Sequence, residues 1–298
     1  MIQISICICT RKRTAGLQTL LGSFEEMQIP CNTSISVIVV ENDSENFSES
    51  IIKEFSLKSK FKIRYFLERN QGIAFARNRS VKEAGDCDFC CFTDDDQVVA
   101  SDWLKELLKC QNEFNSDGVA GPTLPSFDKE VPAYIKHFHT PKTYQYGTIV
   151  NSAFTGCLLL RKKYLNLIEG PFNVRLNFTG GEDSFLTKQV IDLGGIIRYN
   201  PDAIAYEIIP QNRTTIKFVI NRSFRIANTG LFVRALREKD FNRLAALPRV
   251  LMRFGNGLLI LIPFLIFGKE NRLIGLIKIT KAVGGFSFIL GRKNQFYK

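Results

Sequence analysis

Histidine is scarce in this sequence, which holds two, His137 and His139, among 298 residues. The eight cysteines include one Cys-x-x-Cys pair, Cys87 and Cys90, with no second pair at a matching spacing. A structural zinc site needs four Cys or His ligands, so these residues do not predict one. Other cysteines stand inside apolar runs, which indicates buried, reduced thiols of the kind found in cytosolic proteins.

The C-terminal part has no apolar run as long as a membrane-spanning helix, which needs about 20 residues. Residues 254–268 are fifteen uncharged residues, largely Leu, Ile and Phe, and residues 282–291 form a shorter uncharged run. Pro263 interrupts the longer run, and basic residues flank both. These features predict a helical tail that lies in the plane of a membrane surface. The alternative is that the runs pack against the catalytic body or a second subunit.

Acidic residues are sparse from residue 211 onward, where Lys and Arg exceed Asp and Glu by 14, whereas residues 1–210 carry a formal charge of −3. A nearly neutral body with a basic tail argues against a nucleic-acid binder and suits an anionic membrane surface. A secretory signal is not predicted, because the basic cluster Arg11–Arg13 follows the apolar stretch Met1–Thr10 instead of preceding it. We therefore expect a cytoplasmic protein, peripheral at the inner face of the cell membrane.

Apolar strand-like runs alternate with helical periodicity through the first part of the chain. The predicted strands are Ile2–Cys9, Ser34–Val40, Phe61–Leu67 and Phe89–Phe92, and the predicted helices are Leu17–Met27, Phe47–Phe55, Ile73–Ala84 and Trp103–Phe114. Such alternation predicts an α/β fold with a mostly parallel sheet flanked by helices. Ligands of these folds bind off the carboxyl ends of the strands.

Polar groups follow each of the four predicted strands. They are Thr10 and Arg11, then Glu41 to Asp43, then Asn70 to Gly72, and finally Asp94, Asp95 and Asp96. Ionised carboxylates at a buried strand end are costly unless a cation meets them, and Mg²⁺ or Mn²⁺ prefers carboxylate oxygens. Asp94 and Asp96 can share one side of an extended chain. A divalent metal site is therefore expected here, with a solvated acidic turn as the alternative.

The middle segment, residues 117–146, is rich in proline, which predicts either an acceptor-binding or lid loop or an irregular connection. Further on, Glu182 and Asp183 open a predicted helix that ends at Leu193. Acids in a first helical turn can be ordinary partners of the helix dipole. A basic helix is expected over Thr214–Val233.

Five motifs, in order and spacing, resemble the inverting glycosyltransferases of family two, which have the GT-A fold. The motifs are Cys9–Thr14, Val39–Glu45, Arg69–Asn78, Phe92–Asp96 and Gly180–Leu186. The resemblance extends to roughly Phe232 and points to members that act in bacterial surface-polysaccharide assembly. It implies transfer of a sugar from a nucleoside diphosphate, with UDP favoured, to a hydroxyl of a saccharide or lipid-linked saccharide.

The resemblance also implies residue roles. Asp96, with Asp94 close by, would hold Mg²⁺ or Mn²⁺, and Asp183 would be the catalytic base with Glu182 as its neighbour. Asp43 would lie at the uracil or ribose and Asp95 near the donor sugar or ribose. The remaining donor-binding residues would be Thr10, Arg11, Glu41, Asn70, Gly72 and Arg77. The Gln-x-x-Arg-Trp motif of processive members is absent, and Arg222-Ser-Phe-Arg225 follows instead, which predicts single addition.

The expected domains are a catalytic part over residues 1–232 and a helical basic and apolar tail over 233–298. Within the first, residues 1–115 would bind the nucleotide and 116–232 the acceptor. Two rival functions remain. A nucleotidyltransferase acting on a sugar phosphate usually carries a glycine-rich loop after its first strand, and Arg11–Arg13 supplies the charge without the glycines. A non-enzymatic membrane-surface binding protein would leave the acidic strand ends unexplained.

Overall fold

The computed structural model describes residues 1–267 and 269–292, so residues 268 and 293–298 of the predicted tail lie outside the described residues. The chain divides into two compact units. Unit 1 comprises Met1–Ser126, Pro141–Asn177 and Glu182–Ile208, and unit 2 comprises Phe127–Thr140, Phe178–Gly181 and the chain from Ile209 onward. The predicted border at residue 232 falls inside helix α8, so the functional division into a catalytic part and a tail stays a prediction.

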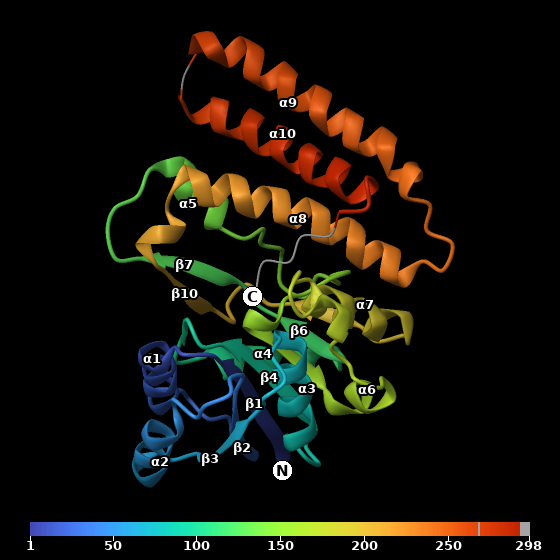
Figure 1. The fold of residues 1–298 in the computed structure, drawn as a ribbon. Helices are drawn as coiled ribbons and strands as arrows, with labels where there is room; N and C mark the ends of the chain where they lie inside the picture. The colour runs from blue at the N-terminus through green and yellow to red at the C-terminus, as the bar shows by residue number, and fades with distance from the viewer. Residues whose placement is uncertain (268, 293–298) are drawn as a thin grey trace. The chain divides into compact units, whose positions relative to one another are not determined.

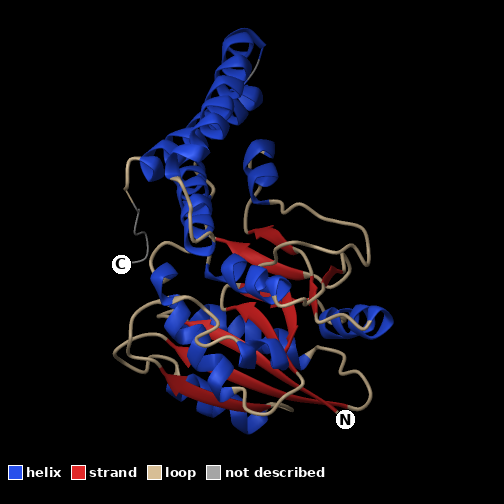
Figure 2. Ribbon diagram, turned by 90° about the vertical axis from the view of Figure 1, so that its right-hand side faces the viewer, coloured by secondary structure: helices blue, strands red, loops and turns tan. Residues whose placement is uncertain are grey.

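Unit 1 is built on a seven-stranded sheet (Figures 1 and 2). Its order is β3 (Lys62–Leu67), β2 (Thr33–Glu41), β1 (Ile2–Thr10), β4 (Phe89–Asp94), β8 (Leu158–Arg161), β6 (Gly118–Ala120), β9 (Ile197–Tyr199). The first four strands are parallel, and β8 runs antiparallel to β4 and β6. A second sheet pairs β5 (Gln97–Val99), β10 (Ala205–Ile209) and β7 (Thr123–Phe127). The prediction of an α/β fold with a mostly parallel sheet is confirmed.

Helices cover both faces of the large sheet because its strands are apolar on both sides. Ile4, Ile6 and Ile8 of β1 belong to one core cluster, while the intervening Cys7 belongs to the other. The helices of unit 1 are α1 (Thr14–Glu25), α2 (Glu49–Lys58), α3 (Ile73–Glu83), α4 (Trp103–Phe114), α6 (Lys162–Leu167) and α7 (Glu182–Asp192). The helices α1 and α4 contribute to the first cluster, and α3, α6 and α7 contribute to the second.

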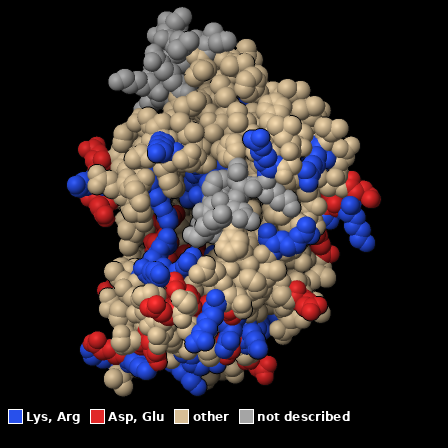
Figure 3. All heavy atoms as spheres, viewed as in Figure 1, with Lys and Arg blue, Asp and Glu red and all other residues tan. Residues whose placement is uncertain are grey.

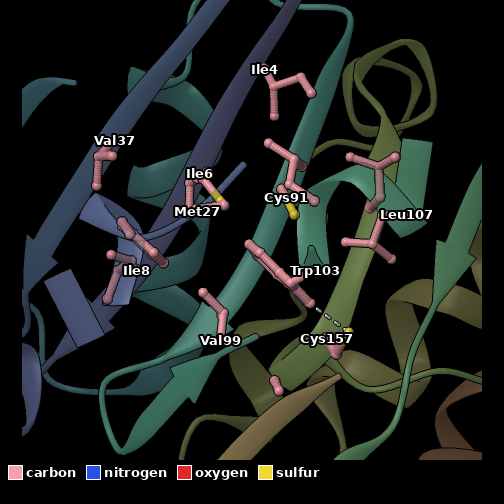
Figure 4. Close-up of a cluster of buried hydrophobic side chains, with 14 of the residues drawn as sticks. Ile4, Ile6, Ile8, Met27, Val37, Cys91, Val99, Trp103, Leu107 and Cys157 are labelled. Atoms are coloured by element: carbon pink, nitrogen blue, oxygen red, sulfur yellow. Dashed lines mark hydrogen bonds between the residues drawn. The ribbon is translucent and has the colours of Figure 1, made fainter. Parts of the chain in front are cut away.

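Trp103 is a fully buried member of the first cluster (Figure 4). Its indole stacks on Phe24 with ring centroids 6.5 Å apart, and its Nε1 donates to Cys157 Sγ at 3.1 Å. A buried indole needs such a hydrogen-bond partner. Each large apolar side chain fully buried in this way contributes about 1.5–3 kcal/mol, so the cluster fixes the strands whose ends carry the polar residues.

Unit 2 is helical, with α5 (Ala133–His139), α8 (Ile216–Arg237), α9 (Leu247–Phe267) and α10 (Lys269–Ile289). Helix α10 packs against both α8 and α9 (Figure 1). At Gly257 a Cβ atom would approach the Gly275 carbonyl oxygen to 3.1 Å, so α9 and α10 meet closely there because both positions are glycine. One helix, Arg243–Leu261, is long and apolar enough to cross a membrane by length and composition alone.

The structure differs locally from two expectations, while an acceptor-binding role of segment 117–146 stays a prediction. The proline-rich segment 117–146 is more regular than expected, because it contains β6, β7 and α5. Pro132 stands just before α5 in an extended conformation with ψ 145°, where its missing N–H costs no helical hydrogen bond. The expected interruption of the helix at Pro263 does not occur, since α9 continues to Phe267. Packing of α9 along α10 outweighs a proline cost of about 3 kcal/mol.

Candidate active site

The carboxyl ends of β1, β2, β3 and β4 lie side by side, as the parallel order requires. Thr10 pairs in register with Glu41, which pairs with Leu67, and Cys9 pairs with Asp94. The four predicted groups of polar residues therefore meet at one edge of the sheet, which we call the rim. Its residues are Thr10 to Arg13, Glu41 to Asp43, Asn70 to Gly72 and Asp94 to Asp96.

Asp95 is a buried acid at the end of β4. Thr10 Oγ1 donates to Asp95 Oδ2 at 2.8 Å, joining residues 85 positions apart. On the other carboxylate oxygen, Arg13 Nη1 donates at 3.0 Å, and the same nitrogen donates to Asp96 Oδ2 at 3.0 Å. Burial raises the pKa of Asp95 to about 6, although the charge of Arg13 and the Thr10 hydrogen bond oppose the rise. Sequence reasoning gave Thr10 and both acids a role but missed Arg13.

Asp43 lies next to two cations of the first loop. Its carboxylate accepts from Arg11 Nε at 3.4 Å and lies 3.6 Å from Lys12 Nζ. The Ser44 backbone N–H also donates to it at 2.8 Å, which fixes the rotamer. Arg11 and Lys12 are exposed, so both ion pairs are weak and can be exchanged for a ligand. Asp43 and Arg11 are thus brought together as the donor-binding prediction requires.

Glu41 is fully buried and plays a different part. Its Oε2 accepts from the Ser48 N–H at 2.7 Å and from the Tyr65 hydroxyl at 2.8 Å. Because the side chain has no exposed surface, it cannot touch a bound donor in this conformation. The arrangement indicates that Glu41 shapes the turn that carries Asp43. A direct contact of Glu41 with the donor, which we expected, would need a different conformation.

The loop with Asn70 and Gly72 is held by two asparagines that sequence reasoning gave no role. Asn42 Nδ2 donates to the Asn70 carbonyl at 2.7 Å, and its Oδ1 accepts from Gly72 N–H at 2.8 Å. Gly72 has φ +137°, and a Cβ there would lie 2.3 Å from Asn177 Cγ. Asn177 Oδ1 in turn accepts from Ala74 N–H at 2.9 Å near the start of α3. Only glycine fits this turn.

Arg77 joins the rim to the Glu-Asp motif, which consists of Glu182 and Asp183. Its Nη2 lies 3.0 Å from Asp94 Oδ1, and its Nη1 pairs with Glu182 Oε1 at the start of α7. Glu182 is buried, and its Oε2 has no hydrogen-bond partner among the described residues. The guanidinium side chain is 9% exposed. In the structure the guanidinium of Arg77 lies between Glu182 of α7 and Asp94 of β4. Its expected role in lining the nucleotide pocket stays a prediction.

Asp183, next in the motif, is half-buried and accepts from Ser184 N–H at 2.6 Å. Burial raises the pKa of both Glu182 and Asp183 above the ordinary range of carboxyl groups, and the positive charge of Arg77 limits the rise. A carboxylate with a raised pKa is a better proton acceptor at neutral pH than an ordinary one. Asp183 therefore has the electrostatic setting of a general base.

The rim acids also fit a divalent metal. The side chains of Asp94 and Asp96 are 38% and 22% exposed, so their oxygens can reach a ligand. No group of three or more His, Cys, Asp or Glu residues suited to a metal occurs among the described residues. Mg²⁺ is commonly held by one or two carboxylates plus substrate phosphates and water. Two carboxylates therefore suffice for an ion that shares its coordination with a diphosphate.

The histidines belong to unit 2, within α5. His139 lies among aromatic rings, with Phe218 stacked at 6.0 Å between centroids and Phe138 edge-on at 5.3 Å. Its Nε2 lies 3.1 Å from the Arg213 carbonyl oxygen. Burial lowers its pKa. These contacts give His139 a packing role.

Comparisons with known proteins agree with this geometry. Residues 5–168 match the model of glycosyl transferase family 2. The succinoglycan biosynthesis protein ExoM of Rhizobium meliloti (strain 1021) is 29% identical over 240 residues, which are 80% of this chain and 76% of ExoM.

Two solved structures share the fold. The mannosyltransferase PcManGT of Pyrobaculum calidifontis, in complex with GDP-Man and Mn²⁺, has a TM-score of 0.69 at 16% identity, over 98% of this chain and 88% of its own. TarS of S. aureus, solved with UDP-GlcNAc, has a TM-score of 0.54 at 16% identity, over 100% and 93%. Against a longer TarS chain, the match covers 76% of this chain and spans 40% of the TarS length. The expected GT-A fold is confirmed, and the chain belongs to glycosyl transferase family 2.

Proposed function

We propose that this protein is an inverting glycosyltransferase that moves one sugar from a nucleoside diphosphate to an acceptor hydroxyl. The observation that carries the proposal is the Arg77 bridge, which joins Glu182, the neighbour of Asp183, to Asp94 at the end of β4. A proton acceptor and a set of phosphate- and metal-binding groups then share one site. The nucleotide-sugar complexes of PcManGT and TarS support this class of donor. Among nucleotides we favour UDP, as the resemblance in the sequence implies.

The reaction needs one displacement. Asp183 accepts the proton of the acceptor hydroxyl, whose oxygen forms a bond to the anomeric carbon as the bond to the diphosphate breaks. The electron pair leaves with the diphosphate, and attack from the opposite face inverts the configuration. When bound to Asp96 and Asp94, Mg²⁺ or Mn²⁺ offsets the charge that grows on the diphosphate. A base of this kind typically contributes about 10²–10⁴-fold to the rate.

The other rim residues bind and orient the donor. Asp43 and Arg11 lie at the end of β2 and in the first loop, where the base or ribose would bind. Thr10 and Asp95 form a buried pair that orients the ribose or donor sugar. The Asn70–Gly72 turn supplies backbone at close range, because Gly72 carries no side chain. The similarity to ExoM supports a saccharide or lipid-linked saccharide as acceptor and a role in surface-polysaccharide assembly.

We place the enzyme at the inner face of the cell membrane, attached through α9. Leu251, Met252 and Leu259 of this helix are 52%, 62% and 69% exposed. Arg249 and Arg253, also exposed, stand among them. On the face shown in Figure 3, the surface over α9 and α10 is mainly uncharged with scattered Lys and Arg. Each Arg at a bilayer centre costs about 2.5–3.5 kcal/mol, which favours in-plane attachment of α9 over a span.

A donor screen tests the chemistry. UDP-, GDP- and dTDP-sugars labelled in the sugar are incubated with the full chain, Mn²⁺ and a lipid-linked saccharide extract. We expect sugar transfer or slow hydrolysis with release of nucleoside diphosphate. Release of pyrophosphate from a nucleoside triphosphate and sugar phosphate would instead indicate a nucleotidyltransferase. No turnover and no nucleotide binding would leave only the membrane-binding function.

Liposome flotation tests the location. Changing Leu251, Met252 and Leu259 to Ser should abolish flotation with anionic vesicles, because each of these side chains contributes about 1.5–3 kcal/mol when fully buried in the interface. A matched control changes Leu57, Leu167 and Leu193, which are exposed residues of unit 1, to Ser. Flotation of the α9 variant at the wild-type level would mean that α9 does not carry the attachment.

A further inference from the structure

One guanidinium nitrogen bridges the two carboxylates that follow Asp94. Arg13 Nη1 lies 3.0 Å from Asp95 Oδ1 and 3.0 Å from Asp96 Oδ2. The Asp95 side chain is 6% exposed and stays fixed by Thr10, whereas Asp96 is the partly exposed acid predicted to hold the metal. The positive charge of Arg13 therefore already lies at the carboxylate that a divalent cation would use.

Arg13 is placed to leave this position. Its side chain is 48% exposed, and it precedes the first residue of α1 without making a side-chain capping bond. The residue before it, Lys12, has a positive φ of 54°. The loop therefore turns sharply at Lys12 and directs the Arg13 side chain toward the acids that follow β4. Both acid contacts use the same nitrogen, so the guanidinium does not form the two-pronged pair that makes arginine–carboxylate contacts strong.

We propose that Arg13 is a counter-ion that Asp96 exchanges for the divalent metal, and that the released guanidinium then binds the diphosphate of the donor. A dication and a guanidinium at the same carboxylate repel each other, so the metal displaces the weaker, exposed partner. The planar guanidinium matches phosphate oxygens, and the diphosphate brings the negative charge that Arg13 loses. The second half of this proposal rests on the proposed nucleotide-sugar donor.

Arg13 differs from its neighbours in the first loop in the acids that it contacts. Arg11 and Lys12 pair with Asp43, at the end of β2, and not with the acids that follow β4. Lys12 therefore provides a matched control: it is adjacent, exposed and positively charged, but it does not touch Asp95 or Asp96 in the structure.

The test measures Mn²⁺ and UDP binding separately in the full chain. Free Mn²⁺ is followed by electron paramagnetic resonance without nucleotide, and UDP affinity is measured by calorimetry at saturating Mn²⁺. Arg13→Gln should bind Mn²⁺ about three- to tenfold more tightly than the wild type, because a competing cation is gone. The same variant should bind UDP at least about tenfold more weakly, because a charged contact to phosphate is lost.

Lys12→Gln should change Mn²⁺ affinity by less than about twofold, and Arg13→Lys, which keeps the charge, should keep a Mn²⁺ affinity close to that of the wild type. Thermal unfolding checks that each variant is folded; should Arg13→Gln unfold, Arg13→Met takes its place in both measurements. Unchanged or weaker Mn²⁺ binding by the neutral variant would overturn the exchange, and unchanged UDP binding would overturn the diphosphate contact. If the wild type binds neither UDP nor GDP, the proposed donor is wrong, while the Mn²⁺ comparison still decides the exchange.

Discussion

Removing Arg77 should destabilise the protein in a way that depends on pH. In Arg77→Met the guanidinium disappears while a flexible apolar stem is kept. Two acids lose their partner, Glu182 and Asp94. Asp94 is 38% exposed, so water replaces the guanidinium there at little cost. Glu182 is 7% exposed, so it is left as a buried, unpaired carboxylate, and that loss dominates.

The cost depends on the protonation of Glu182. Leaving a buried ion-pair partner uncompensated costs about 3–5 kcal/mol, a large share of a typical total stability of about 5–15 kcal/mol. Burial already raises the pKa of Glu182, and loss of the Arg77 charge raises it further. A group whose folded pKa lies above its unfolded value loses stabilisation as pH rises through that interval. The variant should therefore lose more stability at pH 8 than at pH 5, by about 1.4 kcal/mol for each unit of added pKa shift.

Urea denaturation at the two pH values measures this difference, and the double variant Arg77→Met with Glu182→Gln provides the control. Replacing the acid by its neutral amide removes the group that titrates, so the double variant should be more stable than Arg77→Met at pH 8 and should lose the pH dependence. An equal loss of stability at pH 5 and pH 8, or a double variant no better than the single one, would refute the assignment of the buried charge to Glu182.

Three further predictions concern the chemistry. Asp183→Asn should lower kcat, measured from initial rates, by about 10²-fold or more. The affinity for UDP in Mn²⁺, measured by calorimetry, should stay within about twofold of the wild type. A loss of kcat below about tenfold would assign the base to another residue. In the wild type, kcat/KM should fall as pH decreases through the pKa of Asp183, which burial raises above its ordinary value. Asp96→Asn should abolish the part of UDP binding that needs Mn²⁺ with little change in Tm; donor binding equal to wild type in both Mn²⁺ and chelator would contradict a metal role.

Much of the site follows from strand order alone. Once the first four strands are taken as parallel neighbours, the residues after each of them must share one edge, so the contact of Thr10 with Asp95 needs no further information. The period of two along β1 likewise predicts which side chains enter which core layer. These features depend on local patterns and on one topological rule, which is why the sequence predicts them.

The missed contacts depend on backbone turns and distant helices. Arg13 reaches Asp95 because Lys12 takes a left-handed conformation, for which lysine has no preference that a pattern could reveal. Arg77 and Glu182 lie 105 positions apart, on two helices whose relative placement no periodicity encodes. A signal did exist for Arg77: it stands on the face of α3 that holds the buried Ala74, Ser80 and Val81, where a charge needs a buried partner.

The ion pairs of the rim imply that metal and donor bind together. Metal alone has to displace Arg13 from Asp96, and a diphosphate alone brings about two negative charges next to the rim acids. When both arrive, the dication neutralises Asp96 and the phosphates together, and the released guanidinium gains a new anionic partner. Each component thus removes the electrostatic cost of the other. Occupancy by Mn²⁺ and UDP should therefore be cooperative in the wild type, and the cooperativity should shrink in Arg13→Gln, where metal no longer competes with a resident cation.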